Sequence, residues 1–439
     1  MIELDRVALQ DLKGTDFFSR YVAKRQPVIL TGWSDDLKTV REQWTSFAYL
    51  RSKAGEATVH VERFHPTQQQ YGTCLQREVM TFGDFLHALE EEKPEEGYYP
   101  YLTTQYHLAE EEEEEDPFPQ PIRSLLRDIP LVPAVTYHLA LQQINLWMGR
   151  APLLKESTSS GLHHDYHDNL YCLVKGAKRF LLFPPEAAFH VRPFGTVSKI
   201  HENGLIVYKE VGVEIRDDGI SEEEAQRIHR LCEEKTRTKV RDEEEEVDES
   251  EEEEEDGGFL GLPDAEENMS DEEADFDFDF EGEDDFDLLE QGLAEESEEE
   301  ESAQRKKRKV EPAEPLSFSQ IKAADLHAHL GLVTKGSTVS KKEKKEITKA
   351  LDAAGEPFVA HLEEGEMLYL PAGWWHEVSS YAPSAKKEED DEGKHVHMAL
   401  NYWFHPPTKV DTAKCPYKDA AVAWYRQSEA KKMYEKITQ

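Results

Sequence analysis

A histidine and an aspartate two positions apart offer the clearest chemistry in this chain. They are His163 and Asp165, in the run His163-His164-Asp165. On a β-strand, residues i and i+2 point to the same side, so both side chains can reach one ion. Two imidazoles and one carboxylate on one face of a ferrous ion leave its other positions open, as oxygenases require. The pair therefore predicts two of three metal ligands, and a second histidine must come from elsewhere.

The spacing alone does not distinguish this pair from others. His60-Val61-Glu62 and His361-Leu362-Glu363 repeat it, and such pairs are usually solvated surface residues. The sequence after His163 is more informative, because it predicts two apolar strands that turn at a lysine and a glycine. Lys178 lies on the returning strand, 15 residues after His163.

Lys178 would bind the far carboxylate of the ligand if the metal binds a dicarboxylate. A ligand that chelates iron at one end needs a cation at its other end, and a lysine ammonium suits that contact. The alternative is a surface lysine near a hairpin, the usual fate of this residue type.

The third ligand should come from a distant strand. Glu366 to Leu370 predicts a buried strand, and it is followed by a Pro/Gly turn, Trp374, Trp375 and His376. A histidine beside tryptophans is more often a packed core residue than a ligand, so both interpretations stay open for His376 taken alone.

The elements that must position these residues are mainly strands, with a few helices. Period-2 or continuous apolar runs predict strands at 27–31, 57–61, 143–148, 170–183 (two strands that turn at 175–176), 366–370 and 397–404. Helices are predicted from residue 82, capped by Thr81, over 342–354, and within 417–437. Many strands with peripheral helices favour a β-barrel or sandwich core.

Charge divides the 439-residue chain. Its net charge is −41, but residues 242–301 alone hold 34 acidic side chains and no Lys or Arg, which leaves −7 for the remainder. A stretch so rich in charge and poor in apolar residues cannot offset its ordering entropy. We therefore expect four parts: 1–213, the first part of a barrel with its N-terminal elements; 214–315, a disordered acidic insertion; 316–406, the second part of the barrel; and 407–439, a helical segment.

The bulk composition also excludes some function classes. A remainder close to neutral gives no support for direct nucleic-acid binding. The N-terminus lacks a signal-peptide pattern, and no apolar run approaches the roughly 20 residues that span a bilayer. We expect an intracellular protein without a membrane partner. Four scattered cysteines predict neither a zinc module nor a disulfide framework.

Taken together and in order, these segments resemble the JmjC family of oxygenases. The resemblance rests on Pro27-Val28-Ile29-Leu30, Met80 to Phe85, the strand that carries His163, Phe183-Pro184-Pro185, Gly373 to His376 and Asn401-Tyr402-Trp403-Phe404. It covers most of residues 15–213 and 316–406. The best match is the group of small protein hydroxylases that includes factor inhibiting hypoxia-inducible factor and the JmjC lysyl hydroxylases.

The resemblance implies a fold, a cofactor and a cosubstrate. The fold is a double-stranded β-helix, a jelly-roll barrel, mainly β with peripheral helices. The cofactor is Fe(II) and the cosubstrate is 2-oxoglutarate. Residue by residue, His163, Asp165 and His376 match the iron ligands; Lys178, Ser160 and Tyr101 match residues that contact the distal carboxylate of 2-oxoglutarate; Asn169 and Asn401 match two asparagines near it. Strand-end amides that bond to backbone are the alternative for the two asparagines.

The implied activity is hydroxylation of a protein side chain, with a lysine as one option. Two alternatives remain: a histone lysine demethylase, and a catalytically silent barrel that binds basic nuclear proteins. The fold does not decide among them. The C-terminal helical segment is compatible with a homodimer or with packing on its own barrel.

The insertion carries two further expectations. The acidic block should attract basic proteins such as histones or ribosomal proteins, or it serves only as a solubilising spacer. The basic run from Arg305 to Val310 resembles a nuclear localisation signal, and the alternative is a counter-charge to the neighbouring acids. We expect a nuclear or cytoplasmic location, or both.

Overall fold

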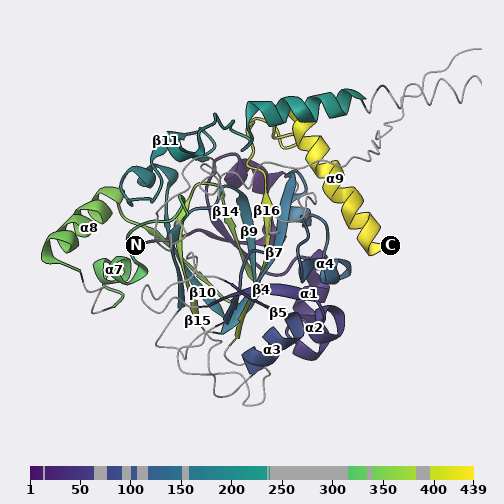
Figure 1. The fold of residues 1–439 in the computed structure, drawn as a ribbon, viewed down its shortest axis with the longest axis horizontal. Helices are drawn as coiled ribbons and strands as arrows, with labels where there is room; N and C mark the ends of the chain where they lie inside the picture. Colours follow the sequence, from purple (N-terminus) through teal and green to yellow (C-terminus); the bar gives the residue numbers. More distant parts are fainter. Residues whose placement is uncertain are drawn as a thin grey trace, which may run out of the picture.

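Two β-sheets that face each other form the centre of the molecule (Figure 1). The computed structural model describes residues 1–12, 15–63, 77–90, 100–105, 117–150, 158–234, 237, 315–333, 339–381 and 396–439. The acidic block, the basic run at 305–310 and a charged stretch at 386–394, for which the sequence predicts a hairpin loop, lie outside the described residues.

The smaller sheet has five strands. Their order is β1 (Ile2–Glu3), β13 (Phe358–Leu362), β10 (Ala177–Phe183), β15 (Trp375–Tyr381) and β8 (Thr158–His163). This sheet carries both candidate histidine ligands and Lys178. The segment 170–183 does form two strands, and the turn between them places Gly176 at a φ of 90°, a conformation that favours glycine.

The larger sheet has nine strands. Their order is β2 (Arg6–Ala8), β3 (Val28–Thr31), β14 (Glu366–Leu370), β9 (Asp168–Lys175), β16 (Val396–Phe404), β7 (Leu141–Arg150), β6 (Pro100–Leu102), β4 (Thr58–Arg63) and β5 (Glu78–Thr81). A separate pair joins β11 (Val197–Ile200) and β12 (Ile206–Tyr208).

Strands from before and after the insertion alternate in both sheets. In the smaller sheet β10 lies between β13 and β15, and in the larger sheet β9 lies between β14 and β16. One apolar cluster lies between the sheets. It contains Phe180 and Leu182 from the smaller sheet and Leu173 and Leu368 from the larger sheet. The two barrel parts therefore build one structure, and the double-stranded β-helix inferred from the sequence requires such alternation.

Helices surround the sheets (Figure 1). Their bounds are α1 Lys38–Gln43, α2 Phe47–Ala54, α3 Phe82–Glu90, α4 Ile122–Leu125, α7 Ala323–His329, α8 Lys341–Ala354 and α9 Ala420–Thr438. The predicted cap is present, because the Thr81 hydroxyl accepts from the backbone N–H of Asp84 at 3.0 Å. Ser340 and Asp419 cap α8 and α9 in the same way. In the described part of the chain, no helix combines the length and hydropathy needed to cross a bilayer.

The predicted start of the insertion at residue 214 is too early. Residues 222–234 are helical, and Ile215 and Ser221 form a β-bridge before them. Ile215, Ile220 and Ile228 are buried in a core that also contains side chains of α7 and α8. These few aliphatic residues, spaced among charges, are enough to hold the segment against the barrel.

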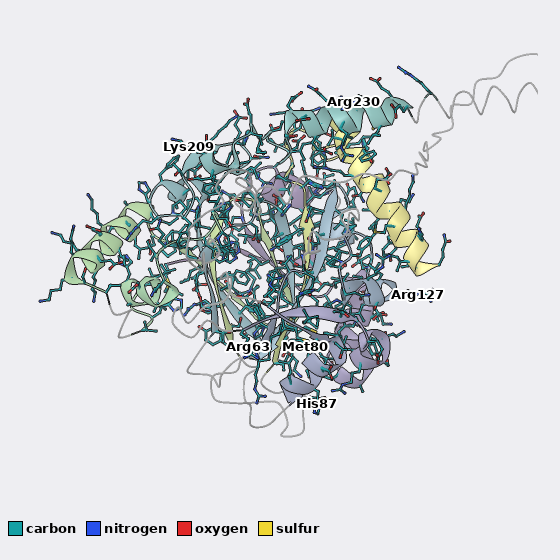
Figure 2. The ribbon with its side chains drawn as sticks, viewed as in Figure 1. Arg63, Met80, His87, Arg127, Lys209 and Arg230 are labelled. Atoms are coloured by element: carbon teal, nitrogen blue, oxygen red, sulfur yellow. The ribbon has the colours of Figure 1, made fainter. Side chains whose placement is uncertain are left out.

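Packed side chains fill the space between and around the sheets (Figure 2). The labelled residues Arg127, Lys209 and Arg230 lie at the periphery and are exposed. The site described next lies between the two sheets, away from these surface residues.

Candidate metal centre

Strand β8 ends at His163 in an irregular stretch that places Asp165 beside it. The register between β8 and β15 shifts, and Gly161 in this stretch adopts a φ of 73°, which favours glycine. Asp165 follows the strand, and its carbonyl oxygen accepts a 2.9 Å hydrogen bond from the N–H of Gly373. That bond ties the segment carrying Asp165 to the turn before His376.

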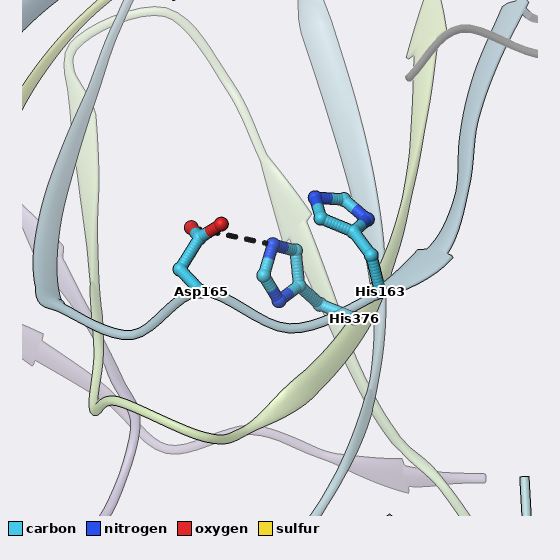
Figure 3. Close-up of side chains that lie close together, drawn as sticks. All are labelled: His163, Asp165 and His376. Atoms are coloured by element: carbon cyan, nitrogen blue, oxygen red, sulfur yellow. Dashed lines mark ion pairs between the residues drawn. The ribbon is translucent and has the colours of Figure 1, made fainter. Parts of the chain in front are cut away.

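His376 lies directly across from His163. The two residues are register partners in β15 and β8, and their ring centroids are 4.2 Å apart. Nε2 of His376 is 3.7 Å from a carboxylate oxygen of Asp165 (Figure 3). One ligand atom from each of the three residues lies within 4.8 Å of the others. In the part of the chain described here, this is the only such group of three, so the other two His-x-Glu pairs form no comparable cluster.

Backbone carbonyls orient both imidazoles. Nδ1 of His163 is 3.1 Å from the carbonyl oxygen of Gly161, and Nδ1 of His376 is 2.9 Å from that of Trp374. An Nδ1–H that donates to a carbonyl leaves the Nε2 lone pair for a metal. Phe318 adds a further restraint, because its ring stacks on His163 with centroids 4.7 Å apart and an angle of 12°.

Burial sets the protonation of the cluster. It lowers the pKa of His163 to about 4, with a further contribution from His376, and it lowers the pKa of His376 to about 4. It raises the pKa of Asp165, opposed by His163 and by a hydrogen bond from Asn169. The imidazoles are therefore neutral at pH 7, the form that binds metal, and a cation would offset the burial of the carboxylate. This donor set fits Fe(II).

Lys178 is buried on β10, with a relative exposure of 2%. Its Nζ donates to the Ser380 hydroxyl at 2.7 Å and lies 5.5 Å from the centre of the Tyr101 ring. No carboxylate forms an ion pair with it in the described part of the chain. Burial lowers the pKa of Lys178 to about 7. A buried ammonium held only by a hydroxyl and a ring is suited to an anionic ligand.

The structure brings three other predicted residues toward the same interior. Tyr101, on β6, is buried beneath the Lys178 ammonium. The side-chain amide of Asn401 donates to Asn169 at 3.1 Å and accepts from the Trp147 indole at 2.8 Å. The two asparagines thus link neighbouring strands, and Asn169 also bonds to Asp165.

Ser160 has a different contact from the one inferred for it. Its hydroxyl donates to the Gly161 carbonyl at 3.4 Å. The hydroxyl that contacts Lys178 belongs to Ser380, which is the register partner of Lys178 on one side and of Thr158 on the other. Sequence reasoning missed Ser380, because only the strand register reveals it. A contact between Ser160 and a bound cosubstrate stays a prediction.

An ion pair that sequence reasoning also missed anchors the turn before His376. The Arg25 guanidinium binds both carboxylate oxygens of Asp168, which is fully buried. Asp168 also accepts from the Ala372 N–H at 3.0 Å and the Tyr369 hydroxyl at 2.6 Å. The Trp374 indole donates to the Arg25 carbonyl at 3.1 Å. These bonds fix the Pro/Gly turn from which β15 begins.

A second buried carboxylate supports the outer face of the same strands. Glu377 accepts from the hydroxyls of Ser159 at 2.6 Å and Ser379 at 2.9 Å, and lies 3.0 Å from His327 of α7. Burial alone would raise the pKa of Glu377, but the bond with His327 and the charge of Arg179 hold it below its ordinary value. The network attaches α7 to the sheet that carries both histidine ligands.

Comparison with known proteins identifies the family. The model of the cupin-like domain matches residues 14–410. The chain is also 33% identical over 435 residues to JmjC domain-containing protein 4 of Schizosaccharomyces pombe, which covers 94% of this chain and 86% of the relative. The chain belongs to the cupin-like family of JmjC-domain proteins.

Two further relatives match shorter parts. Lysine-specific demethylase JMJ30 of Arabidopsis thaliana is 29% identical over 170 residues, 38% of this chain and 35% of the relative. The human bifunctional peptidase and (3S)-lysyl hydroxylase JMJD7 is 41% identical over 51 residues, 12% of this chain and 13% of the relative. Proteins with two different named activities on lysine thus share parts of this sequence.

Proposed function

We propose that this protein is an Fe(II)- and 2-oxoglutarate-dependent dioxygenase that hydroxylates a side chain of another protein. The observation that carries the proposal is the pairing of two features in one barrel. His163, Asp165 and His376 offer two neutral imidazoles and one carboxylate. Lys178, buried in the same interior, has no carboxylate partner in the described part of the chain. A ligand with a chelating end and a distal carboxylate satisfies both.

Each group of residues has its own task in this proposal. The triad would hold Fe(II), which supplies the activation of oxygen and the oxidation of a substrate C–H bond. Lys178 would bind the distal carboxylate of 2-oxoglutarate and so orient its other end toward the metal, with Tyr101, Ser160, Asn169 and Asn401 beside it. Apolar walls such as those between the two sheets exclude water from the reacting groups.

A lysine side chain is the favoured target. The support is the similarity to two relatives, one named as a lysyl hydroxylase and the other as a lysine-specific demethylase. Stable hydroxylation and demethylation share the same oxidation and differ only in the carbon that is attacked. Mass spectrometry of methylated and unmethylated lysine peptides separates them: hydroxylation adds one oxygen, whereas demethylation removes a methylene for each methyl group lost.

Anaerobic calorimetry tests the proposal without a known substrate. Wild type, His163→Ala and Lys178→Ala are titrated with 2-oxoglutarate, with and without Fe(II). Metal-dependent binding that both variants lose is the expected result. If folded wild type binds no 2-oxoglutarate, the oxygenase proposal fails, and the alternative of a silent barrel that binds basic nuclear proteins takes its place.

The proposed partners follow from the acidic block at 242–301. We propose that it binds basic proteins such as histones or ribosomal proteins, with no direct nucleic-acid contact. Such binding should weaken steeply with salt. Nuclear residence through the run at 305–310 and a homodimer through α9 are further proposals, tested by a reporter fusion and by light scattering.

A further inference from the structure

His397 is a buried histidine for which the described part of the chain provides no hydrogen-bond partner. It lies on β16 with a relative exposure of 1%, and neither ring nitrogen has a hydrogen-bond partner among the described residues. Burial, with a contribution from the Lys178 charge, holds the pKa of His397 well below its ordinary value. The ring is therefore neutral and offers one N–H donor. Buried polar groups without partners are rare in folded proteins and call for an explanation.

The neighbours of His397 place it beside Lys178. Its ring meets the edge of Tyr101, with centroids 5.4 Å apart, and the Lys178 ammonium lies over the same Tyr101 ring. Gly149 is its register partner on β7, and a Cβ there would come within 3.2 Å of the imidazole. The absence of a side chain at Gly149 thus makes room for the ring.

Two more hydroxyls in this interior lack partners. The buried Oγ1 of Thr158 and the buried phenol oxygen of Tyr171 have no hydrogen-bond partner in the described part of the chain. Thr158 is the register partner of Ser380, the residue that holds Lys178, and the Tyr171 phenol interacts electrostatically with that of Tyr101. Buried groups that can donate a hydrogen bond but have no partner among the described residues, near one ammonium, indicate a place built for an anion.

We infer that His397 donates a hydrogen bond to the carboxylate that Lys178 binds, and that it helps to select ligands with a second, distal carboxylate. The inference rests on the proposed function, because that carboxylate is the distal end of 2-oxoglutarate. A neutral imidazole adds a donor without placing a second positive charge beside the ammonium. A ligand without the distal carboxylate would leave these buried donors unpaired, and sites of this kind reject such analogues strongly.

The experiment compares two ligands on three variants. Oxalate chelates a metal but has no arm that reaches Lys178. His397→Leu removes the donor at nearly constant volume, and His397→Gln keeps a donor. His138→Leu is the matched control, since His138 is also buried with both ring nitrogens unpartnered among the described residues, but its ring contacts Phe17, Phe18 and Tyr137 instead. Affinities for 2-oxoglutarate and oxalate are measured anaerobically by calorimetry on the Fe(II)-loaded protein.

We expect His397→Leu to weaken 2-oxoglutarate binding about 10- to 100-fold, the loss typical of a hydrogen bond to a charged group. Oxalate binding should change less than about twofold, and His397→Gln should recover at least half of the loss on a logarithmic scale. His138→Leu should leave both affinities unchanged. His397→Leu should also unfold at no lower temperature than wild type, because it removes an unpartnered buried group. If His397 were purely structural, His397→Leu would unfold at a lower temperature than wild type and would not weaken 2-oxoglutarate binding selectively.

The outcomes separate this inference from the function on which it rests. If wild type binds 2-oxoglutarate in a Lys178-dependent way and His397→Leu binds it equally well, only the role of His397 is refuted. The same holds if His397→Leu loses oxalate and 2-oxoglutarate in parallel, or if His397→Gln recovers nothing. If wild type binds no 2-oxoglutarate, the proposed function fails as well.

Discussion

Binding of 2-oxoglutarate should draw a proton onto Lys178. Burial lowers the pKa of this lysine to about 7 in the free protein. A carboxylate placed against the ammonium favours its charged form and raises the pKa again. At pH 8 the free lysine is about one-tenth protonated, so the complex should take up about 0.9 proton; at pH 6 the uptake should be about 0.1.

The direction of this pKa change determines how the affinity for 2-oxoglutarate depends on pH. A group whose pKa rises on binding contributes its full stabilisation below the free pKa and loses it as pH climbs toward the bound value. The affinity for 2-oxoglutarate should therefore be flat below about pH 6.5 and fall by up to about tenfold per pH unit above pH 7. The groups that face the ammonium are the Ser380 hydroxyl, the Tyr101 ring and His397. Burial raises the pKa of the Tyr101 phenol and lowers that of the His397 imidazole, so both stay neutral over this pH range.

Calorimetry in buffers of different ionisation enthalpy measures this uptake directly. Fe(II)-loaded protein is titrated anaerobically with 2-oxoglutarate between pH 6 and 8.5. Oxalate serves as the control, since it chelates the metal without reaching Lys178 and should show no uptake of this kind. An uptake near zero at pH 8, with affinity independent of pH, would show that Lys178 is already charged in the free protein and that the argument from burial is wrong.

Three further predictions concern stability and metal binding. Arg25→Met leaves the Asp168 carboxylate buried without its cation, so urea unfolding should show a loss of about 3–5 kcal/mol. The matched control is Arg6→Met, which removes an exposed ion pair and should cost less than about 1 kcal/mol; equal losses would refute the distinction. Phe318→Ala removes the ring stacked on a metal-ligand imidazole and should weaken Fe(II) binding about 2- to 10-fold, whereas unchanged affinity would mean that the stack does not orient the ligand. Lys178→Met removes a buried ammonium and should raise the free energy of unfolding of the ligand-free protein by on the order of a few kcal/mol at pH 6, with a smaller gain at pH 8.5; a destabilised variant would contradict the assignment of this lysine to a ligand site.

Much of the metal cluster could be predicted because its chemistry is local. The His-x-Asp spacing identified two of the ligands, although the expected geometry was wrong: β8 ends at His163, and Asp165 lies just after the strand. The histidine after a Pro/Gly turn and two tryptophans could be added once the order of segments was considered. Lys178 could also be predicted, because a short hairpin turns the strand that carries it back toward the site. The strands that carry these residues also lie where the apolar runs predict them, for example β14 at Glu366–Leu370.

The remaining parts of the site depend on pairing between distant segments. Arg25 and Asp168 are 143 residues apart, and no periodicity joins them. Ser380 meets Lys178 only because β10 and β15 pair in one particular register. His397 lies in an apolar strand, where a buried histidine without a partner cannot be told from a hydrogen-bonded one. Local patterns carry no information on such contacts.

Two buried carboxylates of the barrel and the neighbours of Lys178 differ in how well their hydrogen bonds are met. Two buried carboxylates near the metal cluster have several partners each: Asp168 has Arg25 and two further donors, and Glu377 has two hydroxyls and His327. Beside Lys178, by contrast, the ring of His397 and the hydroxyl of Thr158 have no hydrogen-bond partner among the described residues. A fold that only needed stability would pair both kinds of group or replace them with apolar side chains. The unpartnered groups beside Lys178 that can donate a hydrogen bond are therefore a cost that a bound anion would offset. This is the physical reason to expect that the ligand stabilises the folded protein.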